Sequence, residues 1–466
     1  MTAGRVSSGS PPDAVPRPRR LVMGAERRVL RRLTALGAAS AVVHAGAPPV
    51  AGWLGVEALA AHVAVVAALL ALQVLAVRLV ARARDDGRAV LAVVLGFGLL
   101  FRLLALPTPV YLSSDVYRYL WDGRVQLAGI SPYRHPPAAP ELAALRDAEI
   151  HPSINRPWAR TVYPPAAQWL FALAGALAPG SLPGWRALLL AVDAAAVALL
   201  LAVLRRLGHP RSLALVYAWS PLVVFEGVQA GHVDLAVVPL VLLAAWWRMD
   251  GRSLPAGVAL GLATLVKLYP AALALAWWRR GDVAFPAAVG ATVALGYAPY
   301  VALHGAGALG FLPEYLGSAE DHNIGLRALL TVPFGLTGET ARAVAMAGLF
   351  GAMLASLVAI ARRHAAGGAR TWEAGALAAG AYLLLVPTSM HPWYVVWIVP
   401  FLATTLSPAW LYFSGAVSVS YVKYLVEPAP FPWWAWVAEY VPLFGLLAHA
   451  GVQALARRTP AAAGAA

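Results

Sequence analysis

One acidic residue opens a polar, aromatic segment that directly follows a long apolar run. Asp115 comes after Ser113 and Ser114, and aromatic and charged side chains then mix as far as Gly123. A carboxylate where an apolar helix meets water is a suitable general base, because it can take a proton from an attacking hydroxyl. The same residues are equally consistent with a helix cap, in which a short polar side chain accepts a bond from the first turn. Both interpretations of Asp115 stay open from the residues alone.

A second cluster of ionisable residues lies in a later polar stretch. Glu320, Asp321, His322 and Asn323 are consecutive, and Arg327 follows them closely. Two acids beside a histidine could hold a metal or assist proton transfer, but such a loop is as often only solvated. Arg327 is consistent with an anion-binding residue or with an anchor whose side chain reaches the membrane interface.

Lysine is rare in this chain, which makes one lysine a candidate. Lys267 and Lys423 are its two lysines, and Lys267 lies in an apolar setting beside Pro270, where a helix must break. A lysine buried there needs a partner, and a phosphate group is a plausible one. The alternative is a side chain that extends to the lipid headgroups.

Two further groups of residues could face a ligand. The tip of an expected helical hairpin carries Glu226, Gln229, His232 and Asp234. His391 begins the segment 391–394, which predicts a helix break with aromatic residues serving as interfacial anchors or as ligand contacts. We expect one or two of the hairpin residues to line a polar cavity and the others to lie at the surface.

The segment after Asp115 predicts a short helix to about residue 126. Its mixture of Tyr117, Trp121 and charged residues favours an amphipathic helix on the membrane surface, with its aromatic side at headgroup level. Asp122 is more typical of a structural partner for Arg118 or Arg124 than of a reacting group.

Composition identifies the class of protein that must position these residues. The chain has 466 residues, of which 60% are hydrophobic and 12% are charged. A soluble domain carries about 25% charged residues, and the long apolar runs lack the alternation of a β-barrel, so the prediction is an all-α polytopic membrane protein. The net charge of +14 reflects arginines at the ends of apolar runs, which argues against a nucleic-acid partner. The absence of cysteine excludes disulfides and thiolate chemistry.

Arginine clusters allow the topology to be drawn, because positive charge gathers on the cytoplasmic side. We expect a disordered basic cytoplasmic tail over 1–32, one transmembrane domain over 33–456 and a cytoplasmic tail over 457–466. Residues 165–180 predict a juxtamembrane or re-entrant helix, and 253–278 predict a broken helix pair. The total is about 11–13 transmembrane helices. The long loops fall together on the non-cytoplasmic side, at 108–164, 229–232, 304–325, 388–392 and 427–435.

Four segments resemble the GT-C superfamily of integral membrane glycosyltransferases, and most closely glycosyltransferase family 87, the polyprenyl-phosphate-mannose-dependent mannosyltransferases. They are SDVYRYLWDG at 114–123, GISPY at 129–133, YPP at 163–165 and HPWY at 391–394. The resemblance extends from about residue 90 to 400. It implies a GT-C-type bundle with a long first catalytic loop that carries juxtamembrane helices.

The resemblance also implies roles for particular residues. Asp115 would be the general base, alone at its position because Ser114 stands where the family often has a second acid. His322 would assist the base or contact the donor, and Lys267 and Arg327 would hold the donor phosphate. Further substrate contacts are expected from Tyr117, Arg118, Trp121, Asp122, Tyr163, Gln168, His232, Asp321, Asn323 and His391. No metal or other cofactor is expected.

The resulting hypothesis is a cell-envelope enzyme of the cell membrane with its active site on the non-cytoplasmic face. It would move a single sugar, expected to be mannose, from a polyprenyl phosphate to a lipid or glycan acceptor, with inversion at the anomeric carbon. One alternative is a polytopic transporter or lipid flippase, which would show paired repeats and ionisable groups at mid-membrane. A non-catalytic membrane scaffold is the other.

Overall fold

The computed structural model describes residues 19–46, 56–317, 323–336, 338–364, 367–385, 389–426 and 429–456. Over these residues the chain is helical throughout: α-helices are joined by 3₁₀ segments and one π-helix, and no strand is present. The predicted all-α class is therefore confirmed.

Six helices in the described part are long and apolar enough to cross a membrane, and a bent pair makes a seventh candidate. The bent pair joins residues 211–218 to η4 (Val223–Gln229) at an angle of 64°. The six are α2 (Val56–Ala83), α3 (Arg88–Ala105), α6 (Leu182–Arg206), the span Ala284–Gly317 that begins with α11 (Ala284–His304), α14 (Glu339–Arg363) and α19 (Trp433–Ala456). Several such helices in one chain define a multi-pass membrane protein.

This number of long helices is smaller than the predicted 11–13, because several of the expected spans are broken into shorter pieces. Proline has no N–H to donate and clashes with the preceding turn, so it interrupts a helix, and Pro270 and Pro392 both lie at such breaks. The pieces are η3 (Arg211–Ala214), α7 (Leu215–Ala218), η5 (Val233–Ala236), α8 (Val237–Met249), α9 (Ser253–Val266), η6 (Tyr269–Ala271), α10 (Ala272–Ala276), η9 (Pro392–Ile398), α16 (Val399–Thr405), α17 (Pro408–Ala416), η10 (Val417–Val422) and α18 (Lys423–Val426). The predicted break in 253–278 lies between α9 and η6.

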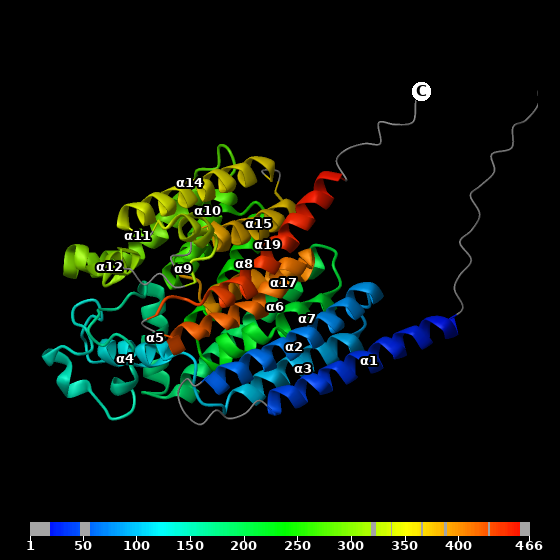
Figure 1. Cartoon of the computed structure of the whole chain (residues 1–466), viewed down its shortest axis with the longest axis horizontal. Helices are drawn as coiled ribbons and strands as arrows, with labels where there is room; N and C mark the ends of the chain where they lie inside the picture. Colours follow the sequence, from blue (N-terminus) through cyan, green and yellow to red (C-terminus); the bar gives the residue numbers. More distant parts are fainter. Residues whose placement is uncertain are drawn as a thin grey trace, which may run out of the picture.

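The N-terminal helix begins earlier than the sequence predicted. α1 (Arg19–Ala45) starts inside the segment 1–32 that was expected to be a disordered tail, and residues 1–18 lie outside the described part. The predicted tail is therefore wrong from residue 19 onward. α1 packs against α2 and α3, and Figure 1 shows these three helices side by side.

Arginine clusters that are distant in sequence meet at one end of the bundle. Arg211 Nε lies 3.0 Å from Asp86 Oδ2, and Arg206 pairs with Asp250. Arg279 Nη2 donates a hydrogen bond of 2.8 Å to the carbonyl of residue 248. These contacts agree with the prediction that the clusters share one side of the membrane.

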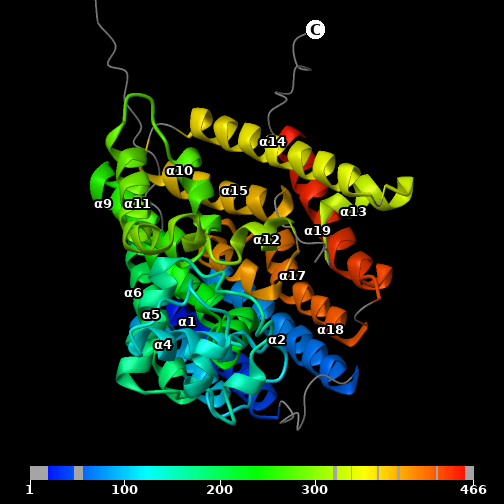
Figure 2. The same ribbon diagram turned by 90° about the vertical axis from the view of Figure 1, so that its left-hand side faces the viewer.

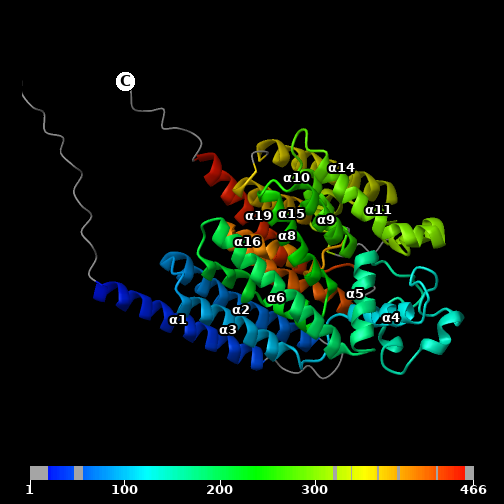
Figure 3. The same cartoon turned by 180° about the vertical axis from the view of Figure 1, so that it is seen from behind.

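The predicted long loops meet at the other end, where α4 and its neighbouring loops project beyond the bundle (Figures 1 and 3). The amide of Phe311 donates to the carbonyl of Thr161 at 2.9 Å, and Gln229 Nε2 donates to the carbonyl of Pro109 at 2.7 Å. The amide of Met390 donates to the carbonyl of residue 323 at 3.0 Å. Four of the five predicted loops are thus joined directly.

The first long loop and the helix that follows it fold together as a cap built on two short helices. Its elements are α4 (Asp115–Leu127), η1 (Pro140–Leu145), η2 (His151–Ser153) and α5 (Pro165–Leu177). α4 packs against α5, and the predicted surface helix with aromatics at headgroup level is wrong, because Tyr119 is 0% exposed and Trp121 is 1% exposed. α5 has only 13 residues, as expected for a juxtamembrane or re-entrant helix.

The remaining elements complete the second half of the bundle. α15 packs against α14, and Figure 2 shows the two helices next to each other. These elements are η7 (Gly305–Leu309), α12 (Leu312–Gly317), α13 (Leu326–Thr331), η8 (Val332–Phe334) and α15 (Ala369–Leu385).

Candidate active site

Asp115 is the first residue of α4, and its carboxylate is held by two side chains from the following loop. Asn155 Nδ2 donates to Oδ1 at 2.7 Å, and the Tyr163 hydroxyl donates to Oδ2 at 3.3 Å. Ser114 precedes the helix without making a side-chain cap bond. The Asp115 side chain keeps 17% of its surface exposed. The structure therefore presents a positioned and reachable carboxylate.

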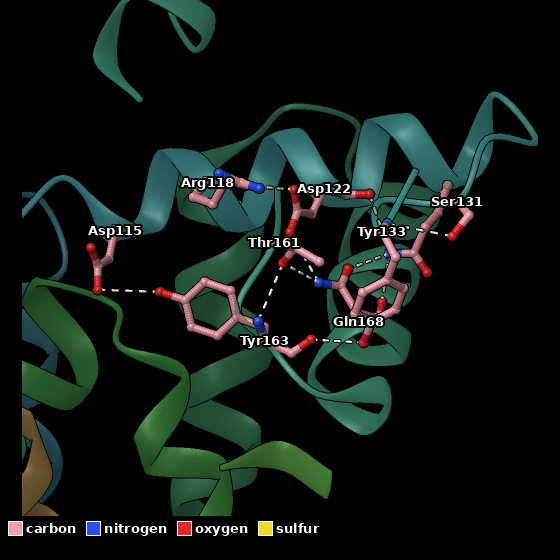
Figure 4. A network of polar contacts seen from close by, with 9 residues as sticks. Asp115, Arg118, Asp122, Ser131, Tyr133, Thr161, Tyr163 and Gln168 are labelled. Carbon is pink, nitrogen blue, oxygen red and sulfur yellow. Dashed lines mark hydrogen bonds and ion pairs between the residues drawn. The ribbon is translucent and has the colours of Figure 1, made fainter. Parts of the chain in front are cut away.

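A chain of hydrogen bonds runs from Asp115 along α4 (Figure 4). The Tyr163 amide donates to Thr161 Oγ1 at 3.3 Å, and Gln168 Nε2 donates to the same oxygen at 2.8 Å. Gln168 Nε2 also donates to Asp122 Oδ2 at 3.0 Å. Arg118 Nε lies 2.8 Å from Asp122 Oδ1, which confirms the predicted pairing of Asp122 with Arg118. This buried network fixes α4 against the start of α5.

The other predicted substrate contacts on α4 pack within the fold. Trp121 lies against His151, with ring centroids 5.2 Å apart, and Tyr117 is half-buried against the core. For these two residues, and for Arg118, Asp122 and Gln168, contact with a sugar stays a prediction.

The hairpin tip brings His232 beside the Asp115 carboxylate. His232 Nδ1 lies 4.0 Å from Asp115 Oδ2, and Nε2 lies 3.4 Å from Glu226 Oε2. Gly231 has a φ of 75°, a left-handed conformation that favours glycine, and its carbonyl accepts a bond of 2.7 Å from Trp185 Nε1. The turn places a fully buried imidazole between two carboxylates.

A three-ring stack holds that imidazole in place. The His232 and Trp393 ring centroids are 4.0 Å apart with an interplanar angle of 17°. His391 also stacks on the Trp393 indole, with their ring centroids 4.5 Å apart and an interplanar angle of 11°. His391 therefore reaches the Asp115 cluster through Trp393.

Lys267 also lies at this site, at the helix break that the sequence predicted. Its Nζ lies 3.3 Å from Asp234 Oδ2, and Tyr269 donates to Asp234 Oδ1 at 3.1 Å. The same ammonium lies 5.0 Å from the Tyr163 ring centroid and 5.6 Å from that of Tyr394. The required partner of Lys267 is thus Asp234, and the predicted contact with a phosphate stays a prediction.

Burial sets the protonation state of two side chains in the loops of this site. Burial lowers the pKa of His232 to about 3, with Lys267 adding to the effect and Asp115 opposing it, so the ring is neutral near pH 7. Burial, together with the nearby Asp115 charge, raises the pKa of Tyr163 well above its ordinary value. Tyr163 therefore remains a hydrogen-bond donor.

The second predicted cluster is only partly within the described residues. Glu320, Asp321 and His322 lie outside them. Asn323 is buried, and its Nδ2 donates to Glu439 Oε2 at 2.7 Å. Arg327 is buried on α13. Their expected contacts with a donor stay predictions, as does the role of His322.

Sequence reasoning missed Asn155 and did not foresee how Trp393 is used. Asn155 holds the carboxylate of Asp115, yet a lone asparagine in a polar loop carries no signal. Trp393 was expected to be an anchor or a ligand contact, and its stacking between two histidines depends on tertiary structure. Within the described residues, no group of three metal-binding side chains is arranged to hold a metal ion.

The fold and the site define a polytopic membrane protein with a cluster of carboxylates, a cation and aromatic rings at one end of its helix bundle. Residues 161–388 match glycosyltransferase family 87. This match, over 228 of the 466 residues, supports the assignment of the chain to that family as a membrane glycosyltransferase. No curated protein and no solved structure matches the chain. The matched range includes Tyr163, His232 and Lys267 and begins after Asp115.

Proposed function

We propose that this glycosyltransferase moves a single sugar, mannose, from a polyprenyl phosphate to a hydroxyl of a lipid or glycan acceptor on the non-cytoplasmic face. The observation that carries the proposal is the meeting of Asp115 and Lys267 on either side of Tyr163. The Tyr163 hydroxyl bonds the carboxylate, while its ring lies 5.0 Å from the ammonium. A base and a cation that contact the same tyrosine suit a displacement at a sugar carbon attached to phosphate.

Asp115 is the general base in this proposal. The acceptor oxygen attacks the anomeric carbon while its proton passes to the Asp115 carboxylate. Asn155 and Tyr163 fix the direction of that carboxylate, and its 17% exposure leaves it reachable. Because the attack is direct, the configuration at the anomeric carbon inverts.

Lys267 stabilises the leaving group. As the bond from the anomeric carbon to the phosphate oxygen breaks, negative charge develops on the polyprenyl phosphate. An ammonium has three N–H donors, so Lys267 can bond Asp234 and a phosphate oxygen at the same time. Asp234 would then orient the ammonium, while the phosphate takes a remaining donor.

The location of the site supports a lipid-linked donor. The carboxylate and the ammonium lie where the broken helices of an apolar bundle meet the cap on α4 and α5. A prenyl chain is as apolar as the lipid around such a bundle, so a donor of this kind would reach the site from the membrane. Mannose is proposed because of the resemblance of the four sequence segments to mannose-transferring members of the family.

Asp115→Asn tests the base assignment, with membranes supplied with polyprenyl-phosphate [¹⁴C]mannose and the labelled product measured by thin-layer chromatography. We expect transfer to fall by about 10²–10⁴-fold, the usual contribution of general-base catalysis. Lys267→Met should instead raise the KM for the donor as well as lower kcat.

Glu141→Gln is the matched control, because Glu141 is a 58% exposed carboxylate of the same cap and is outside the site. It should transfer sugar at the wild-type rate. Wild-type transfer by Asp115→Asn would refute the assignment of the base. Labelled product from polyprenyl-phosphate glucose, with none from the mannose donor, would refute mannose as the transferred sugar.

A further inference from the structure

The ring of His232 has a carboxylate facing each of its nitrogens. Asp115 Oδ2 lies 4.0 Å from Nδ1, and Glu226 Oε2 lies 3.4 Å from Nε2. His232 and Glu226 are both buried, and within the described residues neither ring nitrogen makes a hydrogen bond of normal geometry. A buried imidazole with two such neighbours is unlike a core histidine, whose nitrogens are normally bonded to the backbone or to hydroxyls.

The contacts of Glu226 indicate which nitrogen of the neutral ring carries the hydrogen. The Tyr421 hydroxyl donates to Glu226 Oε2 at 2.8 Å, and His232 Nε2 approaches the same oxygen. Because Glu226 Oε2 accepts from Tyr421, we infer that the hydrogen of the neutral ring is on Nε2, the nitrogen that faces this oxygen. The lone pair is then on Nδ1, which faces Asp115.

We propose that His232 is a positioning residue that strengthens Asp115 as a base, with Glu226 holding the imidazole in the tautomer this requires. The proposal rests on the proposed function, in which Asp115 takes the proton of the acceptor hydroxyl. Once that proton is on Asp115 Oδ2, the new O–H group can donate to His232 Nδ1. The two atoms, 4.0 Å apart in the structure, must approach by about 1 Å for this bond to form. No proton leaves Asp115 in this step. A bond available only to the protonated carboxyl favours protonation and so increases the basicity of Asp115.

The other charged groups around the ring are consistent with this arrangement. Lys267 lies on the side of Tyr163 and Asp234, and it disfavours a positive charge on His232. The stacked ring of Trp393 separates His232 from His391. The ring thus stays neutral and serves Asp115 as an acceptor.

The pH dependence of sugar transfer tests the proposal. His232→Phe keeps a flat ring against Trp393 but removes both nitrogens. It should shift the acid limb of the kcat/KM profile to lower pH by about one unit and lower the plateau rate about tenfold, because one pKa unit corresponds to a factor of ten. Glu226→Leu removes the acceptor for Nε2–H and should shift the limb in the same direction. Glu226→Gln keeps an acceptor oxygen and should restore most of the wild-type profile.

The controls separate this inference from the proposed function. His135→Phe changes a histidine of the cap outside the site and should leave the profile unchanged. If the acid limb of His232→Phe stays at the wild-type pH or moves to higher pH, the inference about His232 is overturned. The proposed function would still be supported by an inactive Asp115→Asn. An active Asp115→Asn would overturn the proposed function itself. Should His232→Phe fold poorly, the comparison of Glu226→Leu with Glu226→Gln decides the inference.

Discussion

Gly123→Ala is expected to separate the two helices that hold the candidate base. A Cβ at position 123 would lie 2.3 Å from the carbonyl oxygen of Phe171 and 2.9 Å from its carbon. Gly175 of α5 lies close to the same point, since its own Cβ would meet the backbone of Gly123 at 3.6 Å. The two glycines therefore permit a close approach of α4 and α5 that any side chain at 123 prevents.

The geometry sets the size of the effect. The obstructing atoms are backbone, so the helices must move apart by about 1 Å to reach normal van der Waals distance. Such overpacking costs about 1–3 kcal/mol of stability. Asp115 begins α4, and Tyr163 lies two residues before α5. Their hydrogen bond is already 3.3 Å long, so the same movement breaks it. Misplacement by about 1 Å can lower a reaction rate by about 100-fold.

Two measurements on purified protein in detergent check this prediction: the midpoint of thermal unfolding, followed by tryptophan fluorescence, and the rate of sugar transfer. Gly96→Ala is the control, because position 96 is also inside a helix and nothing lies within 4 Å of its added Cβ. Alanine there should raise helix stability by up to about 1 kcal/mol. If Gly123→Ala matches the wild type in both stability and activity, the close packing of α4 on α5 is not what positions Asp115.

Three further predictions follow from other contacts. Arg102→Met leaves the buried Asp193 carboxylate without its cation and should cost about 3–5 kcal/mol, whereas the double variant Arg102→Met/Asp193→Leu should recover most of that loss in denaturant unfolding; equal losses in both would contradict the pairing. The folded pKa of His232 is about 3 against an ordinary 6.5, so between these values the unfolded chain binds a proton that the folded chain does not. Stability should therefore fall as the pH drops below about 6.5, by about 2 kcal/mol at pH 5 for this group, and the difference between wild type and His232→Phe measures it. Tyr163→Phe removes the bond to Asp115 but keeps the ring beside Lys267, so kcat should fall a few-fold at constant KM for the donor, while Tyr163→Leu should also raise that KM; identical kinetics of the two variants would show that the ring face has no role.

The fold could be predicted from the sequence wherever one physical signal dominates. The long helices α2, α6 and α14 coincide with continuous apolar runs that end at arginines. Pro270 predicted the break after α9, because proline cannot continue the backbone ladder. Pro221 lies in the break before Val223–Gln229 and marks the bend there. The π-helical form of that segment depends on packing against neighbouring helices.

The candidate site could be predicted only as separate residues. Asp115 and Lys267 stand out because ionisable side chains are costly in an apolar sequence and so need a reason to be there. Their common contact with Tyr163 and the approach of His232 to Asp115 join segments far apart in the chain. No periodicity encodes such a meeting. Trp121 shows the opposite error, since a tryptophan expected at the membrane surface proved to be buried in the cap.

The breaks in the helices are what allow this site to exist inside an apolar bundle. Backbone groups freed by a break need partners, because lipid offers none. At the hairpin tip these partners are side chains: Arg186 donates to the carbonyl of Gln229, and Trp185 Nε1 donates to that of Gly231. With the backbone satisfied, the turn can direct His232 toward Asp115, and the break after α9 can direct Lys267 toward Asp234. Continuous helices would have satisfied the backbone without help but would have kept these charged groups apart on separate helix faces.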